Sequence, residues 1–356
     1  MELLPGLPDD VGLECLVRVP YDHFSSVASV CKSWKLQIQQ PEFMRRRKAA
    51  GCTSTVIVMA QAHFDPTRKS GSVKLPATPV YRLTLCEPEN GYWTELPPVP
   101  GYTEGLPMFC QLVGVGLNLV VMGGWNPDTW EVSNAVFVYS FSTASWRRGA
   151  DMPGCRRSFF ACASDLKRTV FVAGGHDDEK NALSSALAYD VAKDKWVQLP
   201  DMAMERDESK GAFQGGKFHV IGGYHTNMQG RFTTSAESFD LSTCQWDPVQ
   251  NDFLDIATCP RTCVGGAGDG RLLMCRDADV AILQNSKWQA VTQLPADIRN
   301  VSYVTAWQGN LLLIGSPRFS EPHKIYMLDL KSYTWTKVET RDGFSGHVQS
   351  GCCLQM

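Results

Sequence analysis

The first fifty residues of the chain carry apolar side chains at the spacing of helices. Apolar residues recur there at steps of three and four, which places them on one face of a helix. Asp9 and Asp10 are candidate N-caps of a first helix, Pro20 ends that segment, and Pro41 opens a third one. On the second predicted helix, the apolar face consists of Phe24, Val27, Cys31 and Trp34. So short a segment cannot hide all of these side chains, which predicts that one face docks on another surface.

From about residue 53 onward, the pattern changes to short apolar strands that repeat along the chain. One unit is an apolar strand that ends in two glycines, then a second alternating strand, a polar turn and a tryptophan. The diglycine follows Leu119–Met122, Val170–Ala173 and Phe218–Ile221. The repeating tryptophans are Trp93, Trp146, Trp196, Trp246, Trp288 and Trp335. One such sheet cannot bury both of its faces, so the pattern predicts six small sheets stacked in a ring.

The two ends of the repeat region complement each other. The first unit begins abruptly at Thr55–Ala60, without the inner strand that precedes this strand in the other units. The segment from His347 to Leu354 is a strand left over after the last tryptophan. We therefore expect the C-terminal strand to complete the first sheet and to close the ring, because closure removes exposed strand edges.

Composition and charge narrow the possible functions. The net charge is −3, from 34 Lys and Arg against 37 Asp and Glu, which argues against a nucleic-acid binder held by phosphate contacts. The 13 cysteines form no C-x-x-C pair, which favours reduced thiols. No stretch is typical of a membrane helix, and the N-terminal segment has neither the basic start nor the apolar core of a signal peptide. We expect no nucleic-acid partner, no membrane partner and a location in the cytoplasm and/or the nucleus.

The sequence offers no linear motif for catalysis. It lacks an H-E-x-x-H zinc motif, a G-x-S-x-G nucleophile turn and a P-loop, and Gly114 and Gly116 are not followed by the third glycine of a dinucleotide site. His219 and His225 flank a diglycine and are interpreted as structural. We therefore predict no catalytic residue, no cofactor and no metal, although linear motifs do not address a site assembled across several sheets.

The N-terminal helical segment resembles an F-box over roughly residues 3–48. The resemblance rests on Leu7-Pro8-Asp9-Asp10-Val11, on the segment from Cys15 to Pro20 and on Val27-Ala28-Ser29-Val30-Cys31-Lys32-Ser33-Trp34. In that family the helices dock on the Skp-type adaptor of a cullin ubiquitin ligase. The adaptor-binding positions that the resemblance implies are Leu7, Pro8, Val11, Leu16, Val19, Pro20, Val27, Val30, Cys31 and Trp34. Cys15 and Val19 stand where larger aliphatic residues are usual, and a helical cap on the second domain is the alternative.

Residues 53–356 resemble kelch repeats, whose copies form the blades of a β-propeller. The resemblance rests on the diglycines and tryptophans, and it weakens at Leu272-Leu273-Met274-Cys275-Arg276, where both glycines are missing. The expected fold is a small all-α F-box of residues 1–50 followed by an all-β six-bladed kelch β-propeller closed by the C-terminal strand. Kelch propellers include a copper-radical oxidase, but no cluster of metal ligands in this sequence supports that chemistry.

Arginines stand at a recurring position of the predicted repeat, just before the innermost strand of a blade. In kelch substrate receptors, arginines at this position line a pocket for acidic peptide segments, and guanidinium donors suit carboxylates. The alternative is a structural arginine that bonds blade carbonyls, and both interpretations stay open. The candidate target-binding arginines are Arg157, Arg206, Arg261 and Arg299, and Pro107 takes this place in the second blade. Further candidates after the diglycines are Trp125, Trp130, His176 and Tyr224.

The two resemblances together imply a substrate-recognition subunit of an SCF-type ubiquitin ligase, which acts by proximity and needs no catalytic residue. The chain, from Met1-Glu2-Leu3-Leu4-Pro5 through Ala60-Gln61-Ala62-His63-Phe64-Asp65-Pro66, is similar to plant kelch-repeat F-box proteins. Members of that group direct the degradation of phenylalanine ammonia-lyase, which controls entry to phenylpropanoid metabolism, and of cytokinin response regulators. The resemblance implies such targets. Two rivals remain, a ligase-independent kelch scaffold and an enzyme built on a propeller.

Two short segments carry weaker signals. The basic run Arg45–Lys48 is either a nuclear signal or a solvated helix end, and we favour the helix end because cations complement the helix dipole there. The last residues, Cys353–Met356, loosely fit a prenylation signature. A C-terminal strand that closes the ring pins that thiol in the fold, so we expect no lipid there.

Overall fold

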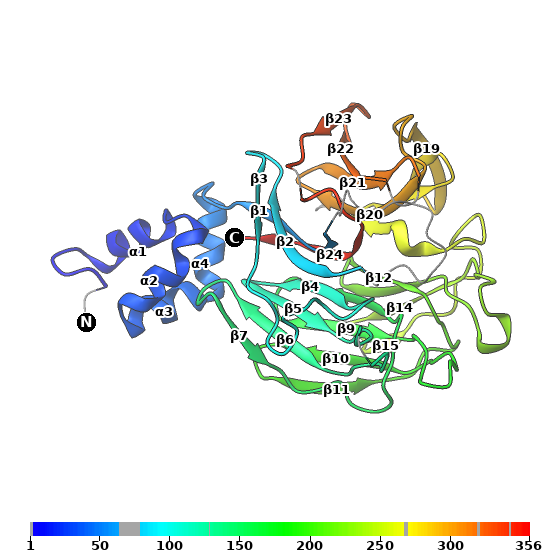
Figure 1. Ribbon diagram of the computed structural model, residues 1–356. Coiled ribbons are helices and arrows are strands. Elements are labelled where there is room, and N and C mark those ends of the chain that lie inside the picture. Colours follow the sequence, from blue (N-terminus) through cyan, green and yellow to red (C-terminus); the bar gives the residue numbers. More distant parts are fainter. Residues whose placement is uncertain (1–2, 64–78, 128, 267–269, 319–320, 342) are drawn as a thin grey trace.

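A computed structural model of the chain describes residues 3–63, 79–127, 129–266, 270–318, 321–341 and 343–356. Met1, Glu2 and Phe64-Asp65-Pro66, which take part in the family resemblance, lie outside this set. A bundle of helices is followed by a ring of six antiparallel sheets (Figure 1). The last helix ends at Ala49 and the first strand begins at Thr55, so the connection between the two parts is short.

The helices differ from the predicted ones in two places. They are α1 (Asp9–Val17), the 3-10 turn η1 (Tyr21–His23), α2 (Phe24–Val30), α3 (Lys32–Gln39) and α4 (Pro41–Ala49). The predicted second helix is interrupted at Cys31, whose extended backbone (φ −160°, ψ 164°) separates α2 from α3. The prediction that Asp9 or Asp10 caps α1 is also wrong, because the helix begins directly after Pro8. The Asp9 carboxylate instead accepts a hydrogen bond from the backbone N–H of Leu3 at 2.8 Å.

Each sheet is a blade of four antiparallel strands, which follow one another from the ring axis outward. Blade 1 contains β24 (Val348–Gln355), β1 (Thr55–Ala62), β2 (Tyr81–Glu87) and β3 (Tyr92–Glu95). Blade 2 contains β4 (Gln111–Val115), β5 (Asn118–Met122), β6 (Val136–Ser140) and β7 (Ser145–Arg148). Blade 3 contains β8 (Ala161–Ser164), β9 (Thr169–Ala173), β10 (Ala186–Asp190) and β11 (Lys195–Leu199).

The remaining blades follow in the same order. Blade 4 contains β12 (Lys210–Gln214), β13 (Lys217–Ile221), β14 (Ala236–Asp240) and β15 (Gln245–Trp246). Blade 5 contains β16 (Cys263–Gly265), β17 (Leu272–Arg276), β18 (Asp279–Gln284) and β19 (Lys287–Gln293). Blade 6 contains β20 (Asn300–Trp307), β21 (Asn310–Ser316), β22 (Lys324–Asp329) and β23 (Trp335–Val338). The fold is therefore the predicted F-box-like bundle and six-bladed β-propeller.

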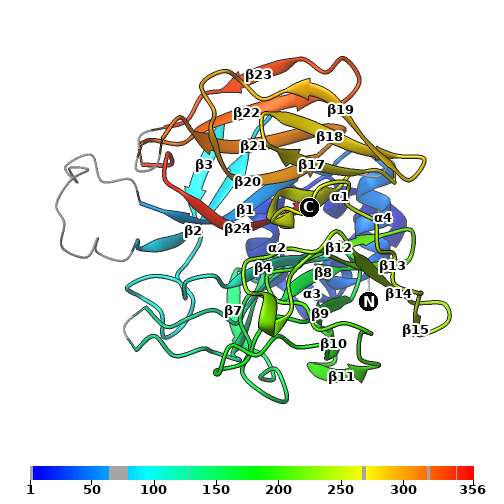
Figure 2. The same ribbon diagram turned by 90° about the vertical axis from the view of Figure 1, so that its right-hand side faces the viewer.

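The C-terminal strand closes the ring, as predicted. β24 pairs antiparallel with β1, with Thr55 opposite Gln355 and Met59 opposite Gly351. The innermost strands contact one another around the axis in the order β24, β4, β8, β12, β16, β20 and back to β24 (Figure 2). The contacts are close where glycine stands: a Cβ atom on Gly211 in β12 would lie 2.6 Å from the backbone N and O of Cys162 in blade 3. The packing of neighbouring blades therefore depends on the absence of a side chain at that point.

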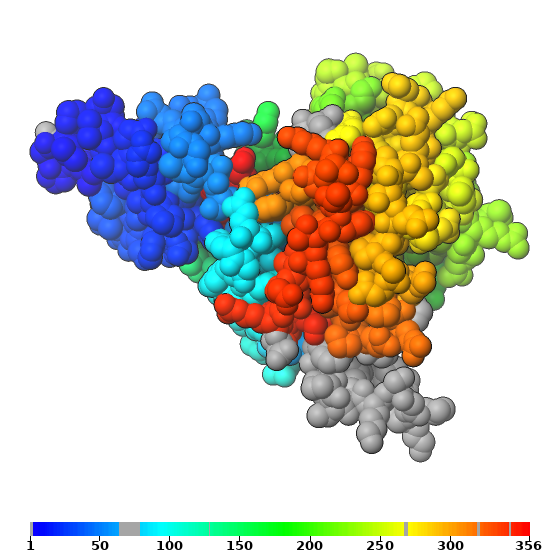
Figure 3. Space-filling model, turned by 90° about the horizontal axis from the view of Figure 1, so that it is seen from above, coloured from blue at the N-terminus to red at the C-terminus, as the bar shows by residue number. Residues whose placement is uncertain are grey.

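The helical bundle packs directly on one end of the propeller. One hydrophobic cluster runs from Phe24 and Phe43 in the bundle to Val56 in β1 and Phe141 after β6. Figure 1 shows the bundle at one end of the ring, against blades 1 and 2, and Figure 3 shows it beside blade 1. We call this end of the propeller the helix-side face. The bundle and the propeller share part of one core, so their relative position is set by packing.

Two polar contacts reinforce this packing. The side-chain amide of Gln39 in α3 donates to the Ser142 hydroxyl oxygen at 3.3 Å, in the turn after β6. The Tyr21 hydroxyl in η1 hydrogen-bonds the Glu87 carboxylate at the end of β2. Burial, followed by this hydrogen bond and the charge of Glu87, raises the pKa of Tyr21 above its usual range. Both contacts join the bundle to the helix-side face.

The opposite end of the propeller is turned away from the helical bundle. In blade 2, β4 runs toward Leu117, whose carbonyl accepts from the Phe141 backbone N–H, and the next residue, Ser142, contacts Gln39 of α3, so the residues before β4 lie at the other end. We call this end the open face, and it is formed by the segments that precede the inner strands, such as residues 107–110, 157–160 and 206–209. Figure 2 shows the molecule from this side, with the helices behind the ring.

Candidate functional site

The helical bundle carries an exposed apolar surface. Leu7 is 39 % exposed, Val11 41 % and Val30 62 %, although each is a large hydrophobic residue. Pro8, Pro20 and Cys31, which were also predicted to bind the adaptor, are exposed as well. Since the core of the bundle is already filled by Phe24 and Phe43, these residues are left over for an outside partner.

Four predicted adaptor positions lie deeper in the bundle. Val19, Val27 and Trp34 are half-buried, and the Trp34 indole N–H donates to the Leu3 carbonyl at 2.6 Å. Leu16 is buried in the core, so the prediction that it contacts a partner is wrong for the chain as folded. It faces inward together with Leu13 and Val17, in the hydrophobic cluster that also contains Phe43 of α4. Sequence reasoning missed Leu36, which is 59 % exposed and lies off the predicted stripe.

Cys31 has a local role that explains the break between α2 and α3. It is the N-cap residue of α3, and its thiol lies 3.0 Å from the Ser33 hydroxyl. Hydrogen bonds from the Ser33 hydroxyl, and next from the Trp34 backbone N–H, lower the pKa of the Cys31 thiol. The V-C-K-S-W string therefore contains the extended residue that separates two short helices.

Arg157 and Arg206 lie inside their blades and not at the surface. The Arg157 guanidinium donates to the Gly174 and Ser185 carbonyl oxygens at 3.3 and 3.1 Å and to the Ser185 hydroxyl at 2.8 Å. Both side chains are buried, and burial lowers the pKa of each guanidinium. Of the two open interpretations, the structural one fits Arg157 and Arg206, because buried guanidinium groups bonded to blade carbonyls do not reach a target at the surface.

Arg206 repeats the same arrangement in blade 4 and adds an ion pair. It donates to the Gly222 and Ser235 carbonyls at 2.7 and 3.1 Å and to the Ser235 hydroxyl at 2.9 Å. Its Nε also donates to the buried Glu237 carboxylate at 3.1 Å. An arginine at this repeated position therefore connects the segment before the inner strand, β12 in blade 4, to the diglycine and to the residue before the third strand, β14. Blade 2 has Pro107 and Ala135 in place of the arginine and the serine, so both halves of the contact are missing together.

Arg261 and Arg299 have a different environment. Both are exposed on the open face, Arg261 in the 3-10 turn η3 (Pro260–Thr262) and Arg299 directly before β20. Arg261 donates to the Val301 carbonyl at 2.9 Å across the boundary of blades 5 and 6. Within the described part of the chain, neither guanidinium is paired with a carboxylate. Of the predicted arginines, these two keep free donors for a ligand.

His176 belongs to a buried chain of polar groups that sequence analysis did not detect. Its Nε2 lies 2.8 Å from the Ser158 hydroxyl and its Nδ1 lies 2.8 Å from the Asp207 carboxylate. The order serine, histidine, carboxylate is that of a hydrolytic triad. However, all three residues are buried, so Ser158 has no surface that a substrate reaches. The chain joins blade 3 to blade 4, and the repeated position directly after Arg157 and Arg206 is the signal that locates Ser158 and Asp207.

The other aromatic candidates divide between core and surface. Tyr224 is buried and its hydroxyl donates to the Glu208 carboxylate at 3.1 Å. Trp125 is half-buried, with its ring 6.4 Å from that of His176, while Trp130 is 55 % exposed. Exposed aromatic side chains suit interfaces, so Trp130 is the one that remains a surface candidate.

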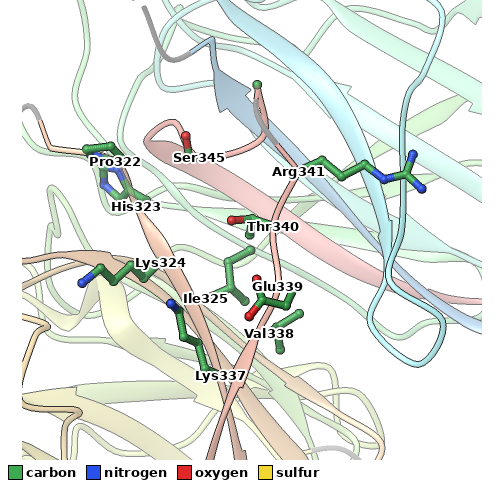
Figure 4. A pocket seen from close by; sticks show the side chains of 11 residues that line it. Pro322, His323, Lys324, Ile325, Lys337, Val338, Glu339, Thr340, Arg341 and Ser345 are labelled. Atoms are coloured by element: carbon green, nitrogen blue, oxygen red, sulfur yellow. The ribbon is translucent and has the colours of Figure 1, made fainter. Parts of the chain in front are cut away.

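A cleft of about 550 Å³ lies between blade 6 and the segment that leads to β24. Its lining mixes apolar Ile325 and Val338 with charged side chains (Figure 4). Lys324 is paired with Asp297 at 2.6 Å, and Arg341 projects away from the other lining residues in Figure 4. The cleft therefore shows no convergence of free charges on one point.

Two further properties bear on the predicted partners. No helix in the described part of the chain is long and apolar enough to cross a membrane. Among the residues that the structure describes, no three His, Cys, Asp or Glu side chains are grouped as they would be around a metal ion.

The fold and its surfaces define a class of protein with two parts, a helical bundle that exposes apolar side chains and a six-bladed propeller with one end uncovered by helices. Comparison with known proteins places the chain more narrowly. The F-box domain model matches residues 4–46, and the Kelch motif model matches residues 109–153 and 156–203.

The chain belongs to the F-box/kelch-repeat family of plants. It is 51 % identical to the Arabidopsis thaliana F-box/kelch-repeat protein At1g80440 and 50 % identical to At1g15670 of the same plant, with 100 % of each chain covered. It is 35 % identical to Arabidopsis F-box/kelch-repeat protein At2g44130, over 99 % of this chain and 92 % of that one. The solved structure of YjhT has a TM-score of 0.59 at 13 % identity, covering 72 % of this chain and 91 % of its own, which shows a shared fold alone.

Family membership gives the general function. An F-box implies binding to a Skp-type adaptor, and a kelch propeller implies binding of a target protein. The chain is accordingly a substrate-recognition adaptor of the SCF type of ubiquitin ligase.

Proposed function

We propose that this chain brings one target protein to a cullin ubiquitin ligase and leaves the chemistry to the other subunits. The apolar surface of the bundle binds the Skp-type adaptor, which connects to the cullin. The open face of the propeller holds the target, with Arg261 and Arg299 as the residues that contact it. The chain contributes proximity and no catalytic group, because the target and the charged ubiquitin carrier are held in one assembly.

One observation carries this proposal: the bundle exposes Leu7, Val11 and Val30 although its own core is complete. A bundle that served only to cap the propeller would turn its apolar residues toward the propeller. In this chain Phe24 and Phe43 belong to the cluster that packs on the propeller, whereas Leu7, Val11 and Val30 lie outside that cluster and are exposed. A surface of this kind is an interaction site.

For the target, we propose phenylalanine ammonia-lyase or a cytokinin response regulator. This rests on the resemblance to plant F-box/kelch-repeat proteins that degrade such proteins, and the expected location is the cytoplasm and/or the nucleus. Degradation of the first would lower the flux into phenylpropanoid metabolism, and degradation of the second would alter cytokinin signalling.

The adaptor surface is tested with matched substitutions of exposed valines. Val30→Asp in α2 places a charge at the proposed interface, and Val197→Asp in β11 places one on a valine of the propeller that is 58 % exposed. We expect Val30→Asp to reduce copurification of the adaptor and the cullin at least about tenfold, because a desolvated charge is costly in an apolar interface. Val197→Asp should have no effect.

The same experiment separates the proposal from its rivals. Equal adaptor binding by both variants, or no binding by the unmodified chain, would contradict the adaptor interface and favour a ligase-independent scaffold. Under proteasome inhibition, proteins that stay bound to the Val30→Asp variant as well as to the unmodified chain are the target candidates, and accumulation of a target in plants that lack this chain would complete the assignment.

A further inference from the structure

The open face carries a pair of aromatic residues at one repeated position. Phe109 precedes β4 by two residues, Phe159 precedes β8 by two residues, and Glu208 precedes β12 by two residues. All three have a left-handed backbone, with φ angles of 61°, 54° and 49°. The fold therefore requires this conformation at the same place in blades 2, 3 and 4, and the sequence places a bulky side chain there each time.

This placement is unusual on physical grounds. A left-handed backbone favours glycine, and for a bulky residue it costs free energy on the order of 1 kcal/mol or more. Left-handed residues such as Ala144 and Asp194 lie in hairpin turns between neighbouring strands, where the turn itself demands them. Phe109 and Phe159 lie in no hairpin. A large side chain at a strained, left-handed position indicates that the side chain itself has a functional role there.

The Phe109 ring is presented to solvent on a rigid support. It is 43 % exposed, and its centroid lies 4.8 Å from that of the half-buried Phe159. Phe159 in turn stacks on His176 at 5.5 Å, which is fixed by its bonds to Ser158 and Asp207. A ring that is already fixed loses little conformational entropy on binding.

The backbone of Phe109 is held from blade 1. The Gln349 side-chain oxygen accepts from the Phe109 backbone N–H at 2.7 Å, and the Gln349 amide donates to the Pro107 carbonyl at 3.1 Å. The strained conformation is thus fixed by the closing strand β24, which explains how it persists.

The same strand also borders the free arginines. Arg261 donates to the Val301 carbonyl in β20, and β20 packs on β24 on the side opposite β4, the strand that follows Phe109. Phe109 and Arg261 therefore flank the start of β24 from opposite sides. On the other path around the ring, through blades 3 and 4, Glu208 lies between Phe159 and Arg261, and its carboxylate repels an acidic group of a ligand. A ligand that contacts both the aromatic pair and Arg261 therefore crosses the open face over blade 1.

We infer that the open face binds a segment of the target that carries a large apolar or aromatic side chain close to acidic residues, with the apolar side chain against Phe109 and Phe159 and the acidic ones at Arg261 and Arg299. This inference rests on the proposed function and names the chemistry of the segment that the target presents. Phe109 is the anchor, and Gln349 is a positioning residue that holds it.

The test is a selection of displayed random peptides on the full-length chain bound to its Skp-type adaptor. We expect enriched peptides to share an apolar side chain near Asp or Glu. Phe109→Gly should weaken their binding at least about tenfold while the melting temperature stays equal or rises, because glycine relieves the left-handed backbone. A ring with only a structural role would lower the melting temperature instead. Arg261→Gln should weaken the same peptides.

The matched control is Leu166→Gly at the turn between β8 and β9. Leu166 is 68 % exposed and left-handed like Phe109 (φ 62°), but it lies at the other end of blade 3. The Leu166→Gly substitution should leave peptide binding unchanged. Enriched peptides without an apolar residue, equal binding by Phe109→Gly, or no enrichment at all would overturn the inference. If peptide binding were lost in Arg261→Gln but not in Phe109→Gly, Phe109 would not be the anchor, although the open face would still bind the target. If the full-length chain did not bind the Skp-type adaptor, that result would count against the proposed function.

Discussion

At the scale of single residues, the arginines show how one repeated position serves two roles. Arg157 and Arg206 point into their blades, where the carbonyl oxygen of the first glycine of the diglycine accepts from each guanidinium. Blades 5 and 6 lack such a diglycine, and Arg261 and Arg299 stay at the surface. An arginine here is structural where the diglycine turn offers it carbonyl partners, and is available to a ligand where the turn does not.

This difference predicts that replacing the arginine with methionine changes the free energy of unfolding strongly in blade 4 and very little before blade 6. Arg206→Met should lower the free energy of unfolding by about 3–5 kcal/mol, because it leaves the buried Glu237 carboxylate without its cation. Arg299→Met should change it by less than about 0.5 kcal/mol, since its side chain is exposed. Chemical denaturation of the two variants measures both. A stable Arg206→Met protein would contradict the structural role.

Two histidines at the seam between blades 6 and 1 predict a pH dependence. Burial lowers the pKa of His323 and of His347 to about 4 each, and their rings lie 5.6 Å apart. The unfolded chain takes up these protons near the usual value of about 6.5, so it binds more protons than the native state between the two values. Stability should therefore fall as the pH decreases from about 6.5 to about 4.

The measurement is the melting temperature across that pH range. Replacing both histidines with glutamine should flatten the dependence, whereas His23→Gln at an exposed histidine of the bundle should not. Unchanged slopes in the double variant would show that other groups, such as the paired carboxylates, govern this range.

At the scale of elements, the inner strands depend on how closely each approaches the next blade. Gly211→Ala in β12 would drive a methyl group against the backbone of Cys162, at 2.6 Å from its nitrogen and oxygen. Gly265→Ala in β16 is the matched control, because its nearest neighbour would be the Phe213 carbonyl oxygen at 3.8 Å. We expect Gly211→Ala to cost about 1–3 kcal/mol and Gly265→Ala less than about 0.5 kcal/mol. Equal melting curves for the two variants would contradict the close contact of blades 3 and 4.

At the scale of the whole molecule, the shared core of the bundle and the propeller fixes the separation of the two proposed binding surfaces. Phe24 and Phe43 pack in the same cluster as Val56 and Phe141. The adaptor surface and the open face lie at opposite ends of this unit (Figure 1). In the proposed assembly, a target on the open face would be held at a set position relative to the ligase.

This shared core predicts that the chain unfolds as one unit. Calorimetry should show a single transition in which α1 to α4 melt together with the propeller, because separating the bundle exposes apolar surface on both sides. Two well-separated transitions would contradict the common core. Tyr21→Phe with Gln39→Ala removes the polar contacts only, and it should lower the transition temperature without splitting it.

The sequence predicted the elements well and the orientation of side chains poorly. The repeats gave the six blades and the strand that closes the ring, because periodicity and turn residues are local properties. The sequence did not predict the break at Cys31, since a cysteine in the extended N-cap position has the same spacing as an apolar residue on a continuous helix. Leu16 and Arg206 were assigned to partners although they face inward, because spacing does not tell which neighbour a side chain meets.

By itself, the sequence determined the two parts of the chain, the number of blades, the closure by β24 and the kinship with F-box and kelch proteins. These properties follow from repeated local patterns, which can be recognised directly in the amino-acid sequence. Only the tertiary structure decided that Arg157 and Arg206 are buried while Arg261 and Arg299 are free, that Ser158, His176 and Asp207 form an inaccessible chain, and that Phe109 stands exposed on Phe159. The reason is that each of these facts depends on which blades lie side by side, and that is set by the packing of residues far apart along the chain.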